Sequence, residues 1–162
     1  MYHSLLVTNF MTLKQQIDGD IKEAMKAKEQ DRLRALRAIK ALILLEETKD
    51  GSVGGDIKPE DEVKLLTKAV KQRRDSADIY RTQGREDLLQ QELAEIGFIE
   101  KYLPQQLSED ELKTRVQDII TRVGATSPAD LGKVMGVATK ELAGQAEGKA
   151  ISAMVKTLLS QQ

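Results

Sequence analysis

Apolar residues recur at every third or fourth position along most of the chain, and this spacing predicts α-helices, because it gathers them on one helical face. A first helix is predicted over about 12–28, and a second from Asp31, as its N-cap, to about 49. Pro59, followed by three acidic residues, predicts a third helix that ends at Gly84. The expected apolar faces are Leu13, Ile17, Ile21 and Met25 in the first helix and Leu33, Leu36, Ile39, Leu42 and Ile43 in the second.

A fourth helix is predicted to end before Pro104, because the residue before a proline is biased away from helical backbone angles. Its expected apolar face is Leu89, Leu93, Ile96, Ile99 and Leu103.

The segment YLPQQLSEDEL (102–112) predicts a boundary followed by a new helix. Ser108 and, three residues later, Glu111 form the pattern of a capping box, and Leu107 and Leu112 are spaced as a hydrophobic staple. The new helix is predicted to stop at Gly124.

Two further helices are expected, one opened by Ser127-Pro128-Ala129-Asp130 and running to about Leu142, the other starting at Glu147 or Gly148. No stretch alternates with the period of a β-strand. The chain is therefore predicted to be all-α. We expect an N-terminal extension over 1–10, a four-helix subdomain over 11–104, a short Pro-containing hinge, and a three-helix subdomain over 105–162.

Composition removes several kinds of chemistry. The 162 residues include no cysteine and one histidine, His3, so no thiolate catalysis, metal site or cofactor is predicted. The net charge of −1 does not indicate a nucleic-acid-binding protein, so any RNA contact would use local basic patches. The longest apolar run, Ala41–Leu45, is too short for a membrane span, and residues 4–11 lack the features of a signal peptide. No membrane association and a cytoplasmic location are predicted.

Catalysis has little support in the sequence, because no nucleotide-binding glycine loop or nucleophile–base pair is found. Glu92 and Glu95 share a helix face, as an acid–base pair would, but pairing with Arg or Lys on a solvated face is the favoured interpretation.

Basic residues form two rows at helical spacing. Arg37 and Lys40 share a face of the second helix, and Lys71 and Arg74 share a face of the third, with Lys68 in the same row. Together these rows would form a phosphate-binding strip. The favoured alternative is that they pair, within the bundle, with Glu46, Glu47, Glu92 and Glu95.

Glycine is concentrated in LGKVMGVATKELAGQAEGKA (131–150), although each interior glycine destabilises a helix by about 1 kcal/mol relative to alanine. Gly132 and Gly136 are four apart and would form a stripe without side chains, flanked by Lys133. Such a stripe admits either a neighbouring helix or the sugar-phosphate chain of a nucleic acid. Gly148 and Lys149 stand where the last helix begins, and free N–H groups there attract anions.

Five segments, in this order, carry a family resemblance: RALRAIKALILLEE (34–47), VKQRRDS (70–76), GREDLLQQELAEI (84–96), YLPQQLSEDEL (102–112) and LGKVMG (131–136). Together they resemble the YqeY family, over about residues 11–162, which makes Met11 a candidate start of the natural chain. Proteins of this family are similar to the C-terminal tail of one subunit of the glutamine-dependent amidotransferase that acts on misacylated tRNA.

The resemblance implies an all-α fold with a hinge near Tyr102-Leu103-Pro104. It also implies a tRNA-facing edge, formed by Gly132, Lys133, Met135, Gly136, Gly148 and Lys149. The sequence departs from the family at GQAEG (144–148), where GRADG is usual, so Gln145 replaces a phosphate-binding arginine.

The expected function is therefore a non-catalytic module that binds tRNA, or a tRNA-modifying or aminoacylating enzyme. The alternative is a protein-interaction module without RNA binding. Least favoured is carbon–nitrogen ligase activity with glutamine as amide donor, which the resemblance assigns to the larger enzyme.

Overall fold

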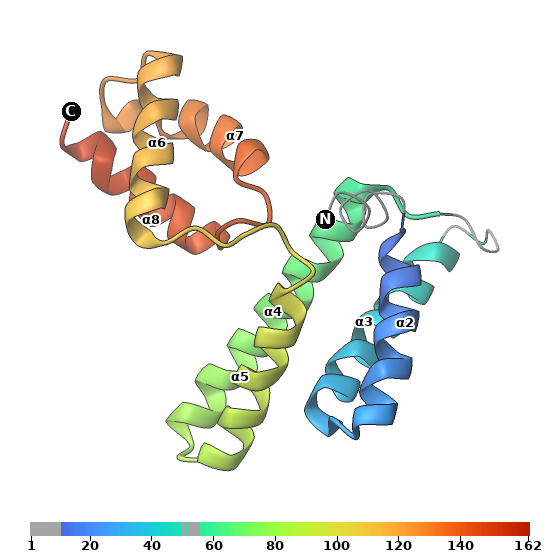
Figure 1. Cartoon of the computed structure of the whole chain (residues 1–162). Coiled ribbons are helices and arrows are strands. Elements are labelled where there is room, and N and C mark those ends of the chain that lie inside the picture. Colours follow the sequence, from blue (N-terminus) through green and yellow to red (C-terminus); the bar gives the residue numbers. More distant parts are fainter. Residues whose placement is uncertain (1–10, 50, 52–55) are drawn as a thin grey trace, which may run out of the picture. The chain divides into compact units, whose positions relative to one another are not determined.

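A computed structural model describes residues 11–49, 51 and 56–162 of the chain, so the predicted extension over 1–10 and most of the glycine-rich segment GSVGGD (51–56) lie outside the described residues. In the described part every regular element is a helix, seven of them α-helices and one a short 3-10 helix (Figure 1). The predicted all-α class is confirmed. The chain divides into two compact units, the first reaching Tyr102 and the second spanning Leu103–Gln162.

Unit 1 contains α2 (Leu13–Ala27), α3 (Gln30–Thr48), α4 (Pro59–Thr82) and α5 (Glu86–Glu100). Within it, α2 lies beside α3 and α4 beside α5, while α3 also contacts α5. Pro59 opens α4 as predicted, and Gly84, with a φ of 70°, lies in the turn that follows it.

The predicted N-cap of α3 is wrong. The helix begins at Gln30 with Glu29 as N-cap, and Asp31 lies inside the first turn. The Asp31 carboxylate accepts a hydrogen bond from Arg34, one turn along the helix, and does not cap the backbone.

The apolar face of α2 also differs from the prediction. Met25 is 54% exposed, and the neighbouring Ala24 is fully buried in its place. At 3.6 residues per turn, repeated steps of four rotate by about 40° each, so Met25 lies about 120° from Leu13, whereas Ala24 lies about 20° from it. Leu93 of α5 is likewise exposed.

Unit 2 contains α6 (Glu109–Val123), a 3-10 turn η1 (Pro128–Asp130), α7 (Leu131–Glu141) and α8 (Gly148–Ser160). The predicted capping box of α6 is present, because the Ser108 hydroxyl accepts the Glu111 N–H and the Glu111 carboxylate accepts the Ser108 N–H, both at 3.1 Å. Gly124 ends α6 in the left-handed conformation.

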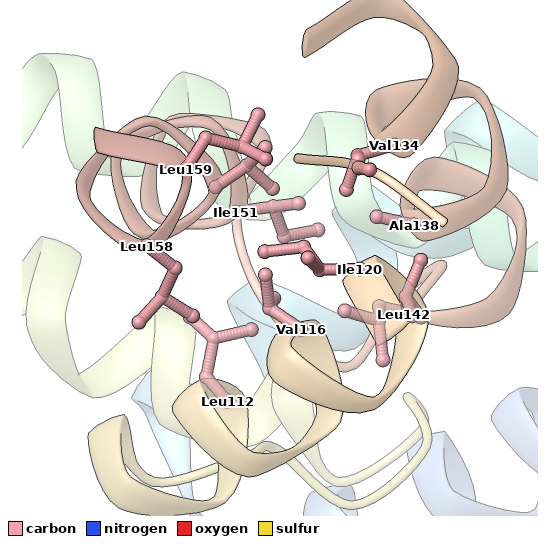
Figure 2. Packing of buried hydrophobic residues seen from close by; sticks show 12 residues of the cluster. Leu112, Val116, Ile120, Val134, Ala138, Leu142, Ile151, Leu158 and Leu159 are labelled. Carbon is pink, nitrogen blue, oxygen red and sulfur yellow. The ribbon is translucent and has the colours of Figure 1, made fainter. Parts of the chain in front are cut away.

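The three α-helices of unit 2 enclose an aliphatic core of their own (Figure 2). The side chains that converge there include Leu112, Val116 and Ile120 from α6, Val134, Ala138 and Leu142 from α7 and the residue after it, and Ile151, Leu158 and Leu159 from α8. The chain before α6 is fastened to the loop before α8, because the Leu107 N–H donates to the Gln145 carbonyl at 2.8 Å.

Candidate nucleic-acid interface

The two glycines of α7 lie on its solvent-facing side. The helix buries Val134 and Ala138, which have no exposed surface. Gly132 precedes Val134 by two residues, and Gly136 precedes Ala138 by two, so each glycine lies about 200° around the helix from a buried residue. Both glycines are exposed. A Cβ added at either glycine would meet no atom within 4 Å. Close packing inside the subdomain therefore does not explain these glycines. We call Gly132, Lys133 and Gly136 the glycine edge of α7.

Lys133 is exposed at this edge and forms no ion pair with another described residue. In unit 2, Arg122 contacts Asp118 at 3.1 Å and Glu141 at 2.5 Å. The acidic group nearest in sequence, Asp130, is occupied by the backbone, since its carboxylate accepts the Thr126 N–H at 2.8 Å and the Ser127 N–H at 3.4 Å. The pKa of Asp130 is lowered by these two N–H groups and, to a lesser degree, by the charge of Lys133.

The start of α8 is a second exposed, positively polarised feature. Gly148 and Lys149 are both exposed, and a Cβ at Gly148 would meet no atom within 4 Å. The N-cap residue, Glu147, makes no side-chain cap, and no acidic residue lies in the first turn. The backbone N–H groups of this turn are thus open to an external anion.

The predicted residues of unit 2 form two places and not one. Gly132, Lys133 and Gly136 lie in the first half of α7, whereas α8 begins after the turn at 142–147 that follows the far end of α7. From Gly132 to Glu141 the helix rises about 14 Å, and the turn at 142–147 follows before α8 begins. Met135 packs partly against the core, so only part of its side chain is available at the edge.

Gln145, the departure from the family pattern, is directed back toward α7. Its side-chain amide donates to the Glu141 carbonyl at 3.3 Å, and its backbone N–H donates to the Leu142 carbonyl at 2.9 Å. The side chain therefore closes the end of α7 and leaves the first turn of α8 uncapped.

The basic rows of unit 1 are largely engaged by acidic residues of their own unit. Lys40 contacts Asp18 at 2.5 Å. Lys71 contacts Asp75 at 3.4 Å, and Arg74 contacts Glu100 at 3.0 Å. Pairing within the bundle was the favoured interpretation, although the carboxylates are not the ones expected. Arg37 is exposed and takes part in no ion pair with another described residue.

Comparison with known protein families matches residues 14–159 to the family described as Yqey-like protein. The chain belongs to the Yqey-like family. The protein named Altered inheritance of mitochondria protein 41, mitochondrial, from Komagataella phaffii is 38% identical over 89 residues, which cover 49% of this chain and 47% of that protein. Its namesake from Lachancea thermotolerans is 31% identical, with 68% and 59% covered. The namesake from Kluyveromyces lactis is 32% identical, with 94% and 86% covered.

This Yqey-like chain thus spans less than two thirds of the length of the first two relatives. Neither the family description nor the relatives' names state a catalytic activity. The predicted cytoplasmic location is contradicted by these relatives, because each is named as a mitochondrial protein. Among the described residues, no helix is long and apolar enough to cross a membrane, and no cluster of acidic or histidine side chains is suited to a metal ion.

Three of the segments that resemble the Yqey-like family meet at one buried carboxylate. Glu95 of α5 is 5% exposed, and its two oxygens accept hydrogen bonds from Arg34 of α3 at 2.8 Å and Arg73 of α4 at 3.1 Å. Burial, followed by repulsion from Glu95, raises the pKa of the nearby Glu92. Because both oxygens of Glu95 hold arginines, the arrangement serves to join three helices and does not suit an acid–base pair.

A second polar cluster of this Yqey-like chain surrounds a cavity of about 240 Å³ in unit 1. The Tyr102 hydroxyl donates to Asp20, and the Arg32 guanidinium lies 3.9 Å from the same carboxylate. Burial, followed by the hydrogen bond to Asp20, raises the pKa of Tyr102 well above its ordinary value, so the hydroxyl stays protonated. Pairing of Glu95 with a basic residue was predicted, although on a solvated face, whereas Glu95 is buried. The cluster around Tyr102 was not predicted, because its members lie far apart along the chain.

Proposed function

We propose that this chain is a non-catalytic helical module that binds tRNA through unit 2, with the glycine edge of α7 against the sugar-phosphate backbone. The observation that carries the proposal is the exposure of Gly132 and Gly136. Glycine at either position destabilises helix α7, and at neither position does another part of unit 2 pack where a side chain would be. Residues that destabilise their own helix, with no compensating contact in the fold, are expected at functional sites.

The surrounding charges favour a polyanion as the ligand. Lys133 and Lys149 are exposed and belong to no ion pair of unit 2, and the first turn of α8 adds uncapped N–H groups. Two such places suit different phosphates of one nucleic-acid strand. The choice of tRNA as the nucleic acid depends on the similarity of the Yqey-like family to the amidotransferase tail.

Filter binding of the purified chain to tRNA and to random-sequence RNA of equal length tests the proposal. We expect a preference for tRNA, with an affinity that falls as salt rises because bound phosphates release counterions. The double variant Lys133→Glu/Lys149→Glu should weaken tRNA binding about tenfold or more. Its matched control, Lys22→Glu/Lys64→Glu, changes the net charge equally at exposed positions of unit 1 and should change binding little.

Two outcomes would contradict the proposal. One is equal affinity for tRNA and random RNA. The other is equal weakening by the two charge-reversed variants, which would mean that net charge alone governs binding. A protein partner that remains bound after nuclease treatment, in the absence of tRNA affinity, would favour the protein-interaction alternative.

A further inference from the structure

Large exposed apolar side chains are distributed unequally between the units. Among the described residues, the exposed ones of this kind all belong to unit 1, namely Met11, Met25, Leu44, Leu45, Ile79 and Leu93. Leu44 and Leu45 are consecutive on α3, and Leu45 is the most exposed of the group at 66%. The surface of unit 1 thus presents apolar groups that the surface of unit 2 does not.

Helix α3 carries exposed apolar residues beyond its core-facing side. Its inner side contributes Leu33, Leu36, Ile39 and Ile43 to the core of unit 1. Its solvent side carries a stripe that we call the outer stripe, formed by Arg37, Ala41, Leu44, Leu45 and Thr48, all of which are exposed. The members follow one another at intervals of four, three, one and three, which is the spacing of one helical face. Exposed apolar residues that gather on one part of a helix surface mark a candidate contact surface.

Arg37 gives the outer stripe a charge at one end. The other basic residues of α3 are engaged, because Arg32, Arg34 and Lys40 each contact a carboxylate of unit 1. Arg37 is exposed and pairs with no described residue. The stripe therefore offers an apolar surface with one available guanidinium beside it.

We propose that the outer stripe binds an amphipathic helix of a partner protein, with apolar side chains over Ala41 and Leu45 and a carboxylate opposite Arg37. An extended segment would leave its own backbone groups unpaired against leucines, whereas a helix satisfies its backbone internally. Arg37 to Thr48 spans about 17 Å, or about three turns of such a helix. This contact resembles the recognition of amphipathic helices through anchors at helical spacing.

A second copy of the outer stripe, paired about Ala41 or in parallel register, does not complement Arg37. An antiparallel pairing centred on Ala41 would bring Arg37 against Leu45 of the other copy, and a parallel pairing would bring the two Arg37 side chains together. Both arrangements leave the guanidinium without a carboxylate. RNA is also disfavoured, because a single free cation among leucines offers little to a phosphate chain.

Site-specific photocrosslinking in cells of the source organism tests this proposal. Leu45 is replaced by p-benzoylphenylalanine, which its exposure tolerates, and the crosslinked peptide is identified by mass spectrometry. We expect one protein partner, joined within a segment that repeats apolar residues every three or four positions and contains Asp or Glu. Arg37→Glu should lower the yield about tenfold, whereas Arg37→Lys should retain most of it. The same photoreactive group at Met25, which is also exposed but lies on α2, should not yield this adduct.

The proposal is overturned if no adduct forms at Leu45. It is equally overturned if the adduct joins another part of this chain, residues 1–10 included, a second copy, or RNA. An adduct whose yield is unchanged by Arg37→Glu would also contradict it. Filter binding of tRNA is independent of these outcomes, so failure here leaves the proposed function of unit 2 intact.

Discussion

At positions 132 and 136 an alanine would be a better helix former than the glycine that is present, and the surrounding structure has room for it. The same holds for Gly97 in α5, whose added Cβ would also meet no atom within 4 Å. These positions differ from Gly84 and Gly124, where a positive φ requires glycine.

Gly132→Ala and Gly136→Ala should each raise the free energy of unfolding of unit 2, by up to about 1 kcal/mol, because alanine has the higher helix propensity. Urea unfolding followed on the methyl resonances of Val155, in the core of unit 2, measures this change. A loss of stability in either variant would mean that other atoms of the protein pack against the glycine edge. That result would contradict its exposure to solvent.

Gln145→Arg should strengthen tRNA binding several-fold, because it restores the guanidinium that is usual in the family beside the first turn of α8. A new phosphate contact should also steepen the dependence of log K on log salt by about 0.9. Titrations at four salt concentrations would reveal both effects. Gln145→Lys, with the same charge but no planar fork, should give a smaller gain. An unchanged slope for Gln145→Arg would argue against phosphate contact at this turn.

At the scale of elements, unit 1 depends on an ionic contact that joins three helices. Glu95 is the only buried charged residue in the described part of the chain, and Arg73 beside it is 16% exposed at the side chain. The two arginines come from α3 and α4, which contact each other much less than each contacts α5. The carboxylate thus connects two helices that have little direct packing.

Glu95→Ala should destabilise unit 1 by about 2–4 kcal/mol, because removal of the carboxylate leaves Arg73 buried without its counter-charge. This loss of stability is smaller than for a fully buried ion pair, because the Arg34 side chain is half exposed and can be hydrated. Urea unfolding followed on Ile39 methyl resonances is the measurement. Asp78→Ala, which breaks the exposed pair with Arg81, is the matched control and should change stability by about 0–1 kcal/mol. Equal effects of the two substitutions would rule out a special role for the buried carboxylate.

The connection between α6 and α7 should make unit 2 sensitive to acid. The folded-state pKa of Asp130 lies below its ordinary value, because its carboxylate accepts two backbone N–H groups. Its contribution to stability is therefore complete above the unfolded pKa of about 3.9, and is lost as pH falls through the lower folded value. Asp130→Asn retains an acceptor oxygen but does not titrate.

We expect wild type to be more stable than Asp130→Asn at pH 6, and the difference to shrink toward zero as pH approaches 2. Unfolding of unit 2 at several pH values, followed on Val155, would show this convergence. A difference that stays constant over this range would mean that the charge of Asp130 has no part in the connection.

At the scale of the whole molecule, the two units have separate cores and different surfaces. Unit 2 presents lysines outside any ion pair and an open glycine edge. Unit 1 has most of its predicted basic contact residues paired internally and exposes apolar side chains. This division assigns the nucleic-acid proposal to one unit and the protein-partner proposal to the other.

Most features that depend on neighbouring residues were predicted correctly from the sequence, although Asp31 does not cap α3. The capping box at Ser108 and the end of α6 at Gly124 were predicted correctly, because each depends on neighbouring residues. Met25 was predicted to be buried because it continues the spacing of four that starts at Leu13. That spacing follows one helical face only over short distances. Pairing of Glu95 with a basic residue was predicted, but its burial and its two partners were not, since the contacts join residues up to 61 positions apart. The exposure of Gly132 to solvent could not be predicted either, because the same local sequence suits packing against a neighbouring helix equally well.

The most direct test of the account measures tRNA affinity after side chains are added to the glycine edge. The double variant Gly132→Leu/Gly136→Leu places good helix formers at both positions, but adds bulk where the nucleic-acid backbone is proposed to approach. The double variant Gly19→Leu/Gly97→Leu adds the same bulk at open positions of unit 1. We predict that the first pair lowers tRNA affinity about tenfold or more at fixed salt, and that the second leaves it unchanged. Equal affinity of both double variants and wild type would contradict the central claim.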